Sequence, residues 1–105
     1  MDTRLEDYFL EIRTLQMLDY KNATENNFDS RTAWFNHMMS QQKDEIAEAI
    51  ISLSERYEVP LSRAAEDFDP SMVLRVGRIK NLEKSSKKLW KFYYTKTLFP
   101  FYKRV

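Results

Sequence analysis

Basic and aromatic residues gather at the C-terminal end of this sequence, and they are its best candidates for binding chemistry. From Arg75 onward the chain holds ten basic residues and one acidic residue, Glu83, whereas the first 74 residues hold seven basic and fifteen acidic residues. Seven of the fifteen aromatic residues lie in the same C-terminal portion. Positive charge attracts phosphates and acidic protein surfaces, and aromatic rings stack on unpaired bases. We therefore expect an acidic, flat or apolar partner to meet this portion of the chain.

The spacing of the C-terminal lysines suits phosphate binding. Several of them recur three to five residues apart, so they can share one face of a helix and neutralise successive phosphates. Aromatic side chains between them are available for stacking on bases. The residues expected to contact nucleic acid or an acidic partner are Arg75, Arg78, Lys80, Lys84, Lys87, Lys88, Trp90, Lys91, Tyr94, Lys96, Lys103 and Arg104.

Two other uses of the C-terminal portion stay open. On a membrane surface the aromatic rings would lie among the headgroups and the lysines would attract anionic lipid, but the order Trp90-Lys91-Phe92 breaks the clean apolar stripe that such a helix needs. Alternatively, the rings pack on the first helix and the lysines meet the acidic front half, within one chain or between two. A homodimer is thus an alternative, and a membrane partner is disfavoured.

Catalytic and cofactor sites are not indicated. The chain has no cysteine, one histidine and one glycine, which excludes disulfides, Cys/His nucleophile pairs, zinc ligand sets and glycine-rich phosphate loops. Its carboxylates fall mainly on polar helix faces, where a solvated or capping role is commoner than a catalytic one. These are Asp44, Glu45, Glu48, Glu66, Asp67 and Asp69. We expect a protein that is not an enzyme and binds no cofactor or metal.

Length and composition indicate one domain. A chain of 105 residues can bury one core, and 43% apolar with 31% charged residues is typical of a globular protein. The sequence divides into a helical body, residues 1–83, and a basic aromatic C-terminal helix and tail, residues 84–105, within the same domain. The start lacks the basic and apolar regions of a secretory signal, and no apolar run reaches the roughly 20 residues of a membrane span. We therefore expect a cytoplasmic location.

Apolar residues recur at helical spacing in the first half of the chain. Thr3 and Glu6 form a capping box for a helix over residues 3–21, and a loop follows over residues 22–27. A second helix is capped by Asp29 or Ser30. A polar run predicts a break near Asp44, after which the helical pattern resumes until Val59-Pro60.

The second half completes an all-α pattern. Ser62 is expected to cap a short helix, and Asp69-Pro70 to start a long basic one that reaches Lys96, before Pro100 leaves residues 101–105 extended. The predicted fold is a small bundle of four to five helices with a long basic C-terminal helix and a short extended tail.

The segment Leu61 to Glu83 resembles a helix-turn-helix unit, in which a short helix, a turn and a basic second helix enter the major groove of DNA. Two features depart from that pattern. Arg75 stands where an aliphatic core residue is usual, and Asp69-Pro70 replaces the small residues of the turn. A generic helical hairpin is the alternative.

Nearly the same stretch, about residues 48–76, resembles phage late-transcription coactivators, which bind RNA polymerase. The resemblance rests on Glu48-Ala49-Ile50-Ile51, Glu55, Val59, Leu61, Ala64-Ala65, Phe68, Met72 and Val76. It implies RNA polymerase as a partner and a docking surface that includes Ile50, Leu53, Ala65, Phe68 and Met72. The C-terminus departs from that family, whose members end in a short acidic and apolar segment that binds the sliding clamp.

Two functional hypotheses follow. The first is a small regulatory binding protein that acts on transcription or other nucleic-acid machinery through its body and its basic segment. The second is a protein inhibitor or assembly adaptor, phage-encoded on the resemblance above, whose acidic front half binds a protein and imitates nucleic-acid charge. The second hypothesis uses Asp44, Glu45, Glu48, Glu55, Glu58, Glu66, Asp67 and Asp69.

Overall fold

The computed structural model describes residues 3–80 and 82 and shows an all-α protein. Its helices are α1 (Arg4–Glu25), α2 (Arg31–Ser40), α3 (Glu45–Arg56), α4 (Leu61–Phe68) and α5 (Met72–Gly77). Over these residues no strand is present, so the predicted all-α class is confirmed.

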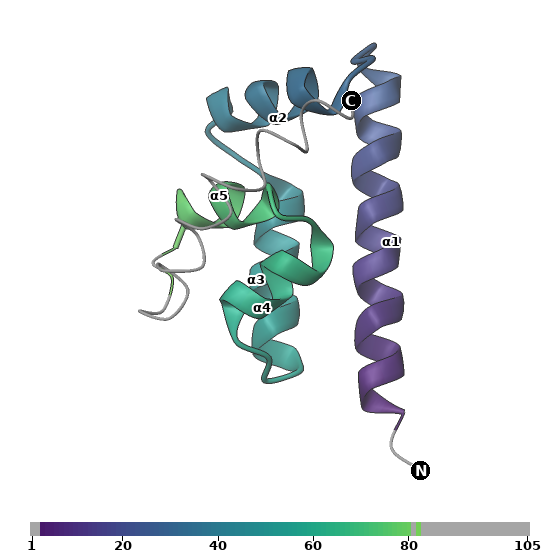
Figure 1. Ribbon diagram of the computed structural model, residues 1–105, viewed down its shortest axis with the longest axis vertical. Helices are drawn as coiled ribbons and strands as arrows, with labels where there is room; N and C mark the ends of the chain where they lie inside the picture. The colour runs from purple at the N-terminus through teal and green to yellow at the C-terminus, as the bar shows by residue number, and fades with distance from the viewer. Residues whose placement is uncertain (1–2, 81, 83–105) are drawn as a thin grey trace.

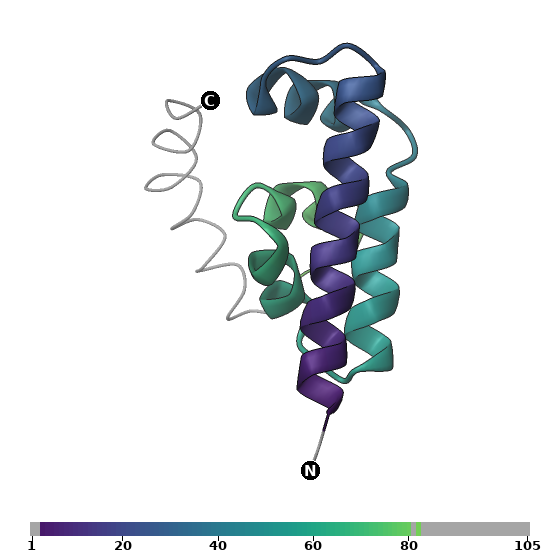
Figure 2. The same ribbon diagram turned by 90° about the vertical axis from the view of Figure 1, so that its right-hand side faces the viewer.

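The helices form a small bundle with α1 along one edge (Figure 1). The long helices α1 and α3 lie side by side, while the shorter α4 and α5 pack against α3 and close the body. Helix α2 crosses the end of the bundle where α1 finishes, as both views show (Figures 1 and 2). The body therefore presents one long outer helix, α1, and one crossing helix, α2.

One apolar core joins α1, α3, α4 and α5. It is built from Tyr8, Ile12, Ile46, Ala47, Ile50, Leu53, Ala64, Ala65, Phe68, Met72, Val73, Val76 and Leu82. A smaller cluster of Ala23, Trp34, Met38 and Phe28 lies between α2 and the end of α1. Most of the apolar driving force for folding thus lies outside α2.

This core corrects the predicted docking surface. Ile50, Leu53, Ala65, Phe68 and Met72 are each no more than 8% exposed. The apolar periodicity that suggested a docking face is the pattern by which three helices bury one another's side chains. These five residues form the core that holds the body together.

Helix α1 begins and ends differently from its prediction. The Thr3 side chain makes no capping hydrogen bond, so the expected capping box is wrong. The helix also continues four residues past Lys21, through residues expected to form a loop. Ala23 is buried against the α2 cluster. That tertiary contact outweighs the weak helix propensity of the surrounding residues.

Both long helices end in the same turn, with a residue of positive φ just past the helix. After α1 that residue is Asn27 (φ 65°), and Phe28 N–H donates to Ala23 C=O. After α3 it is Glu58 (φ 55°), and Val59 N–H donates to Ser54 C=O. These are Schellman turns. Helix α3 therefore stops at Arg56, before the Val59-Pro60 pair that was expected to end it.

Two predicted helix starts are confirmed, and those at Ser62 and Asp69-Pro70 are wrong, because α5 begins only at Met72, after Ser71. The Ser30 side chain accepts a hydrogen bond from Ala33 N–H at 3.0 Å, and Asp44 accepts one from Ala47 N–H at 3.0 Å, which confirms the break near Asp44. Ser62 is not a cap, because α4 already begins at Leu61 and Ser62 is a buried residue within it.

The long basic helix that was expected to start at Asp69-Pro70 is interrupted. Helix α5 has only six residues and ends at Gly77, after which residues 78–80 form a turn and bend. Glycine weakens the helix at this point, and Arg78 turns back to bind the end of α2. The rest of the predicted helix, up to Lys96, and the extended residues 101–105 lie outside the described residues.

The helix-turn-helix interpretation also needs correction. A recognition helix must present several side chains to base edges, but residues 72–76 of α5 are all buried. Segments α4 and α5 form a packed helical hairpin.

Candidate functional site

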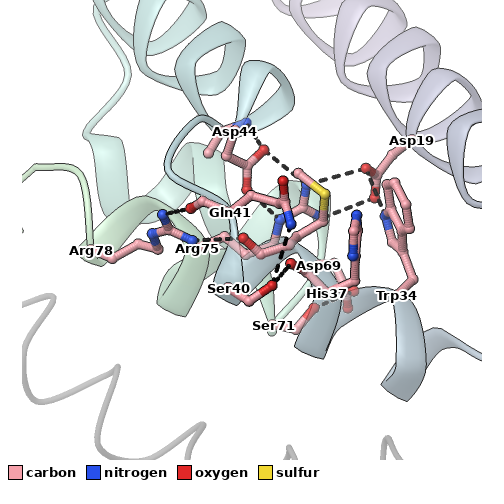
Figure 3. Close-up of polar contacts among 12 residues, drawn as sticks. Asp19, Trp34, His37, Ser40, Gln41, Asp44, Asp69, Ser71, Arg75 and Arg78 are labelled. Atoms are coloured by element: carbon pink, nitrogen blue, oxygen red, sulfur yellow. Dashed lines mark hydrogen bonds and ion pairs between the residues drawn. The ribbon is translucent and has the colours of Figure 1, made fainter.

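The most elaborate polar arrangement of the body surrounds Arg75 (Figure 3). Arg75 Nε and Nη2 donate to the two carboxylate oxygens of Asp44 at 2.8 and 2.9 Å. Nη1 and Nη2 donate to the two oxygens of Asp19 at 3.0 and 3.2 Å. One guanidinium therefore holds two carboxylates, each in a bidentate pair, which is the geometry that arginine favours.

Further hydrogen bonds tie this cluster to neighbouring helices. Trp34 Nε1 donates to Asp19 at 3.0 Å, and Asp44 also caps α3. Asp19 comes from α1, Trp34 from α2, Asp44 from the start of α3 and Arg75 from α5. We call these four residues the Arg75 cluster. It is the point at which those four helices are connected by polar contacts.

Burial and hydrogen bonding act in opposite directions on Arg75. Burial on its own lowers the pKa of this side chain, but the hydrogen bonds to Asp44 and Asp19 outweigh that effect and raise the pKa above its ordinary value. The guanidinium stays charged and is only 3% exposed. Two carboxylates neutralise the buried guanidinium, which contradicts the predicted role of Arg75 as a phosphate ligand.

The sequence contains a signal for this cluster. Arg75 is the one charged residue in the buried run of α5, and Asp19 lies on the same face of α1 as Tyr8 and Ile12. A lone charge on an apolar helix face indicates a buried pair. Reading the two positions together would have predicted that they meet.

The other predicted binding residues lie outside the Arg75 cluster. The Arg78 guanidinium donates to Met38 C=O at 2.6 Å and also to Gln41 C=O, so it caps the end of α2 (Figure 3). Lys80 is exposed, with Nζ 4.0 Å from Glu55. The remaining residues lie outside the described part of the chain: Lys84, Lys87, Lys88, Trp90, Lys91, Tyr94, Lys96, Lys103 and Arg104. Of the predicted basic residues that the structure describes, Arg75 is buried, whereas Arg78 and Lys80 are exposed.

A cleft of about 470 Å³ opens beside the Arg75 cluster. Its walls come from the end of α1, the start of α2 and the α4–α5 junction, and Asp19 and Arg75 also line it. Five aromatic residues contribute to the lining: Tyr20, Phe28, Trp34, Phe35 and Phe68. The volume falls within the range of small-molecule pockets.

Asp69 is the perturbed titrating group of this cleft. Burial raises its pKa, and the hydrogen bonds of Ser71 together with the charges of Arg31 and Arg75 only partly offset that rise. The Ser71 hydroxyl donates to the carboxylate at 2.8 Å, and Met72 N–H donates to Asp69 C=O. These contacts form the turn that starts α5. They give Asp69 a structural role.

The acidic residues proposed to imitate nucleic-acid charge differ in burial, so only some of them are exposed. Asp44 is fully buried and paired with Arg75, while Asp67 accepts a hydrogen bond from Tyr8 at 2.7 Å and pairs with Arg63. The exposed carboxylates are Glu45, Glu48, Glu55 and Glu58. A charge-imitating surface would therefore lack Asp44.

Two further findings concern the described residues alone. No group of three or more histidine or acidic side chains among residues 3–80 and 82 is arranged to hold a metal ion. None of the helices in that part of the chain is long and apolar enough to cross a membrane.

No protein-family model matches this chain, and neither the curated proteins nor the solved structures include a match to it.

Proposed function

We propose that this chain is a small, non-enzymatic regulatory protein that binds nucleic acid, or the machinery acting on it, through the basic segment from Lys80 to Arg104. The observation that carries the proposal is the separation of charge along the sequence. From Lys80 onward the chain holds eight basic residues against one acidic residue, Glu83. Aromatic residues are interleaved with these charges, as in segments that bind single-stranded nucleic acid.

The contacts of Arg75 and Arg78, which precede this segment, bear on where the exposed positive charge begins. Arg75 is neutralised inside the body, so it is not available as a phosphate ligand, whereas Arg78 is exposed and donates to two neutral backbone carbonyl groups. The exposed positive charge therefore begins after Arg75. In this proposal the helical body carries the segment and the segment makes the contacts with phosphates.

The choice of transcription machinery as the target is supported by the resemblance of residues 48–76 to phage coactivators. Because the five residues first expected to dock on polymerase form the core, a polymerase would have to meet another surface of this chain. The proposal places the protein in the cytoplasm together with such machinery.

The test is binding of the full chain to labelled single-stranded DNA, duplex DNA and RNA, measured by fluorescence anisotropy at several salt concentrations. The variant Lys87→Gln/Lys88→Gln removes two charges from the segment. The matched control, Lys21→Gln/Lys43→Gln, removes two exposed charges from the body. We expect wild type to bind with a steep salt dependence, and the segment variant to lower the slope of log K against log salt by about 2.

Equal slopes for the two variants, or no binding to any of the three nucleic acids, would overturn the nucleic-acid proposal. Absence of binding would favour the protein inhibitor or adaptor instead.

A further inference from the structure

The cleft beside the Arg75 cluster carries an excess of negative charge. The charged residues that line it are Asp19, Asp29, Asp69, Arg31 and Arg75. Arg75 is also shared with Asp44, which is fully buried and lies behind the lining. Four carboxylates are therefore served by two guanidiniums. A cation in the cleft would reduce this imbalance.

Two of these carboxylates are shielded from water. Asp19 is only 8% exposed, and Asp69 is half-buried. Burial raises the pKa of Asp69 although the charges of Arg31 and Arg75 act in the opposite direction. The counter-charge already present is thus insufficient for a carboxylate at this depth, because burial disfavours the ionised form unless a cation compensates it.

Aromatic rings form much of the remaining wall. Phe28 and Trp34 both line the cleft, with ring centroids 5.3 Å apart and ring planes at 64° to each other. His37 contacts both rings, at 4.7 and 5.5 Å, but does not line the cleft, so it supports the pair from outside. Tyr20 and Phe68 add two further rings. The faces of aromatic rings attract cations.

We propose that this cleft binds an alkylguanidinium cation, whose planar head group lies against the aromatic rings and donates hydrogen bonds to Asp69. An ionised carboxylate has about four acceptor positions, so the Ser71 hydroxyl, which donates to Asp69 at 2.8 Å, leaves room for further donors. The aromatic lining favours a guanidinium over an ammonium group, because a guanidinium is planar, more weakly hydrated and able to stack on rings. Phosphates would be repelled by the excess of carboxylates.

The cleft has room for more than the head group. Pockets of about this volume, 470 Å³, hold whole small molecules, so an alkyl chain fits as well. The same head group occurs in free alkylguanidines and in the arginine side chains of peptides. Nα-acetyl-arginine methylamide, which carries the group on a peptide backbone, distinguishes these sources in the test below.

The test is a titration of the full chain followed by ¹H–¹⁵N NMR, without nucleic acid, so that its outcome is independent of the function proposed above. The reporter is the Trp34 indole N–H, which donates to Asp19 at the cleft wall (Figure 3). The chain has two tryptophans, and the variant Trp90→Phe identifies the signal of Trp34. The probes are butylguanidinium and butylurea, its neutral isostere.

We expect saturable binding of butylguanidinium with a dissociation constant in the millimolar range, and binding of butylurea at least about tenfold weaker. Binding of Nα-acetyl-arginine methylamide as tightly as butylguanidinium would indicate an arginine side chain as the source. Markedly weaker binding of that amide would indicate a free small molecule.

Two variants test the two kinds of contact at pH 7. Asp69→Asn should weaken butylguanidinium at least about fivefold and leave butylurea unchanged, because it removes charge but keeps the shape of the side chain. Tyr20→Leu replaces an exposed ring of the lining and should weaken butylguanidinium about threefold. The control is Glu48→Gln, which removes one charge from an exposed position of α3 outside the cleft and should have no effect.

Circular dichroism should show that every variant is folded. Equal affinities for butylguanidinium and butylurea would overturn the proposal, since they would show that the cleft does not select for charge. So would the absence of binding in the millimolar range, or an Asp69→Asn variant that binds butylguanidinium as tightly as wild type does.

Discussion

At the scale of single residues, Arg75 has the largest structural consequence in this protein. A buried guanidinium held by two carboxylates is costly to create and more costly to leave incomplete. Removing it strands two negative charges, Asp19 and Asp44, in a site where both are buried.

We expect Arg75→Met to lower the free energy of unfolding by about 3–5 kcal/mol, since breaking a buried pair leaves uncompensated charge. Urea denaturation followed by circular dichroism measures this. Arg78→Met is the matched control, because Arg78 is exposed and bonds only to carbonyl groups. Its cost should be about 1 kcal/mol. Equal costs for the two variants would contradict the role given to the Arg75 cluster.

Asp69 gives a prediction about pH. Its pKa in the folded protein is raised above the ordinary value of 3.8, so folding favours its protonated form. The stability that this provides is fully present below pH 3.8 and is lost as pH rises through the folded pKa. Asp69→Asn removes the titration but keeps an oxygen that can accept from Ser71.

We therefore expect the stability of Asp69→Asn relative to wild type to increase from pH 3.5 toward pH 7. Urea midpoints at both pH values provide the measurement. A difference between variant and wild type that stays constant with pH would show that Asp69 does not titrate differently in the folded state.

Sequence reasoning at the residue scale found the caps Ser30 and Asp44 because capping depends on side chains near in sequence. It failed for Arg75, whose partners lie 31 and 56 residues away. It also assigned Phe68 and Met72 to a docking face, because the same apolar spacing describes a core face and an interface.

At the scale of elements, the turns after α1 and α3 differ in how well their residues fit them. Both place a residue in the left-handed region, at Asn27 and Glu58. Asparagine tolerates this conformation, whereas glutamate pays a steric cost that glycine avoids.

We expect Glu58→Gly to raise the free energy of unfolding by about 0.5–1 kcal/mol, through relief of the left-handed conformation. The substitution also removes the Arg4–Glu58 ion pair, but that pair is exposed and contributes little. Thermal unfolding compares it with Asn27→Gly, whose gain should be smaller because asparagine already suits the position. A larger gain at Asn27 would contradict this account.

Sequence periodicity predicted the helices of this protein better than it predicted where they end. The presence and type of the helices followed from periodicity, since amphipathic spacing is a local property. Their ends did not. Helix α1 runs on to Glu25 because Ala23 packs against the α2 cluster, and α5 stops at Gly77 while Arg78 binds the end of α2. Both outcomes depend on contacts between elements.

At the scale of the whole molecule, the described structure accounts for part of the charge separation seen in the sequence. Inside the body, Arg75 pairs with Asp19 and Asp44, so these three charges neutralise one another there. The all-α class was predictable because successive segments with helical spacing allow few other arrangements.

The Arg75 cluster also bears on how this protein is made. Its first carboxylate is at Asp19 and its only cation at Arg75, so a chain emerging from the ribosome exposes the acids long before their counter-ion. Until Arg75 has left the exit tunnel, closing the bundle would bury unpaired charge, and that cost opposes collapse of the shorter nascent chain. The body should therefore close only when α5 has emerged.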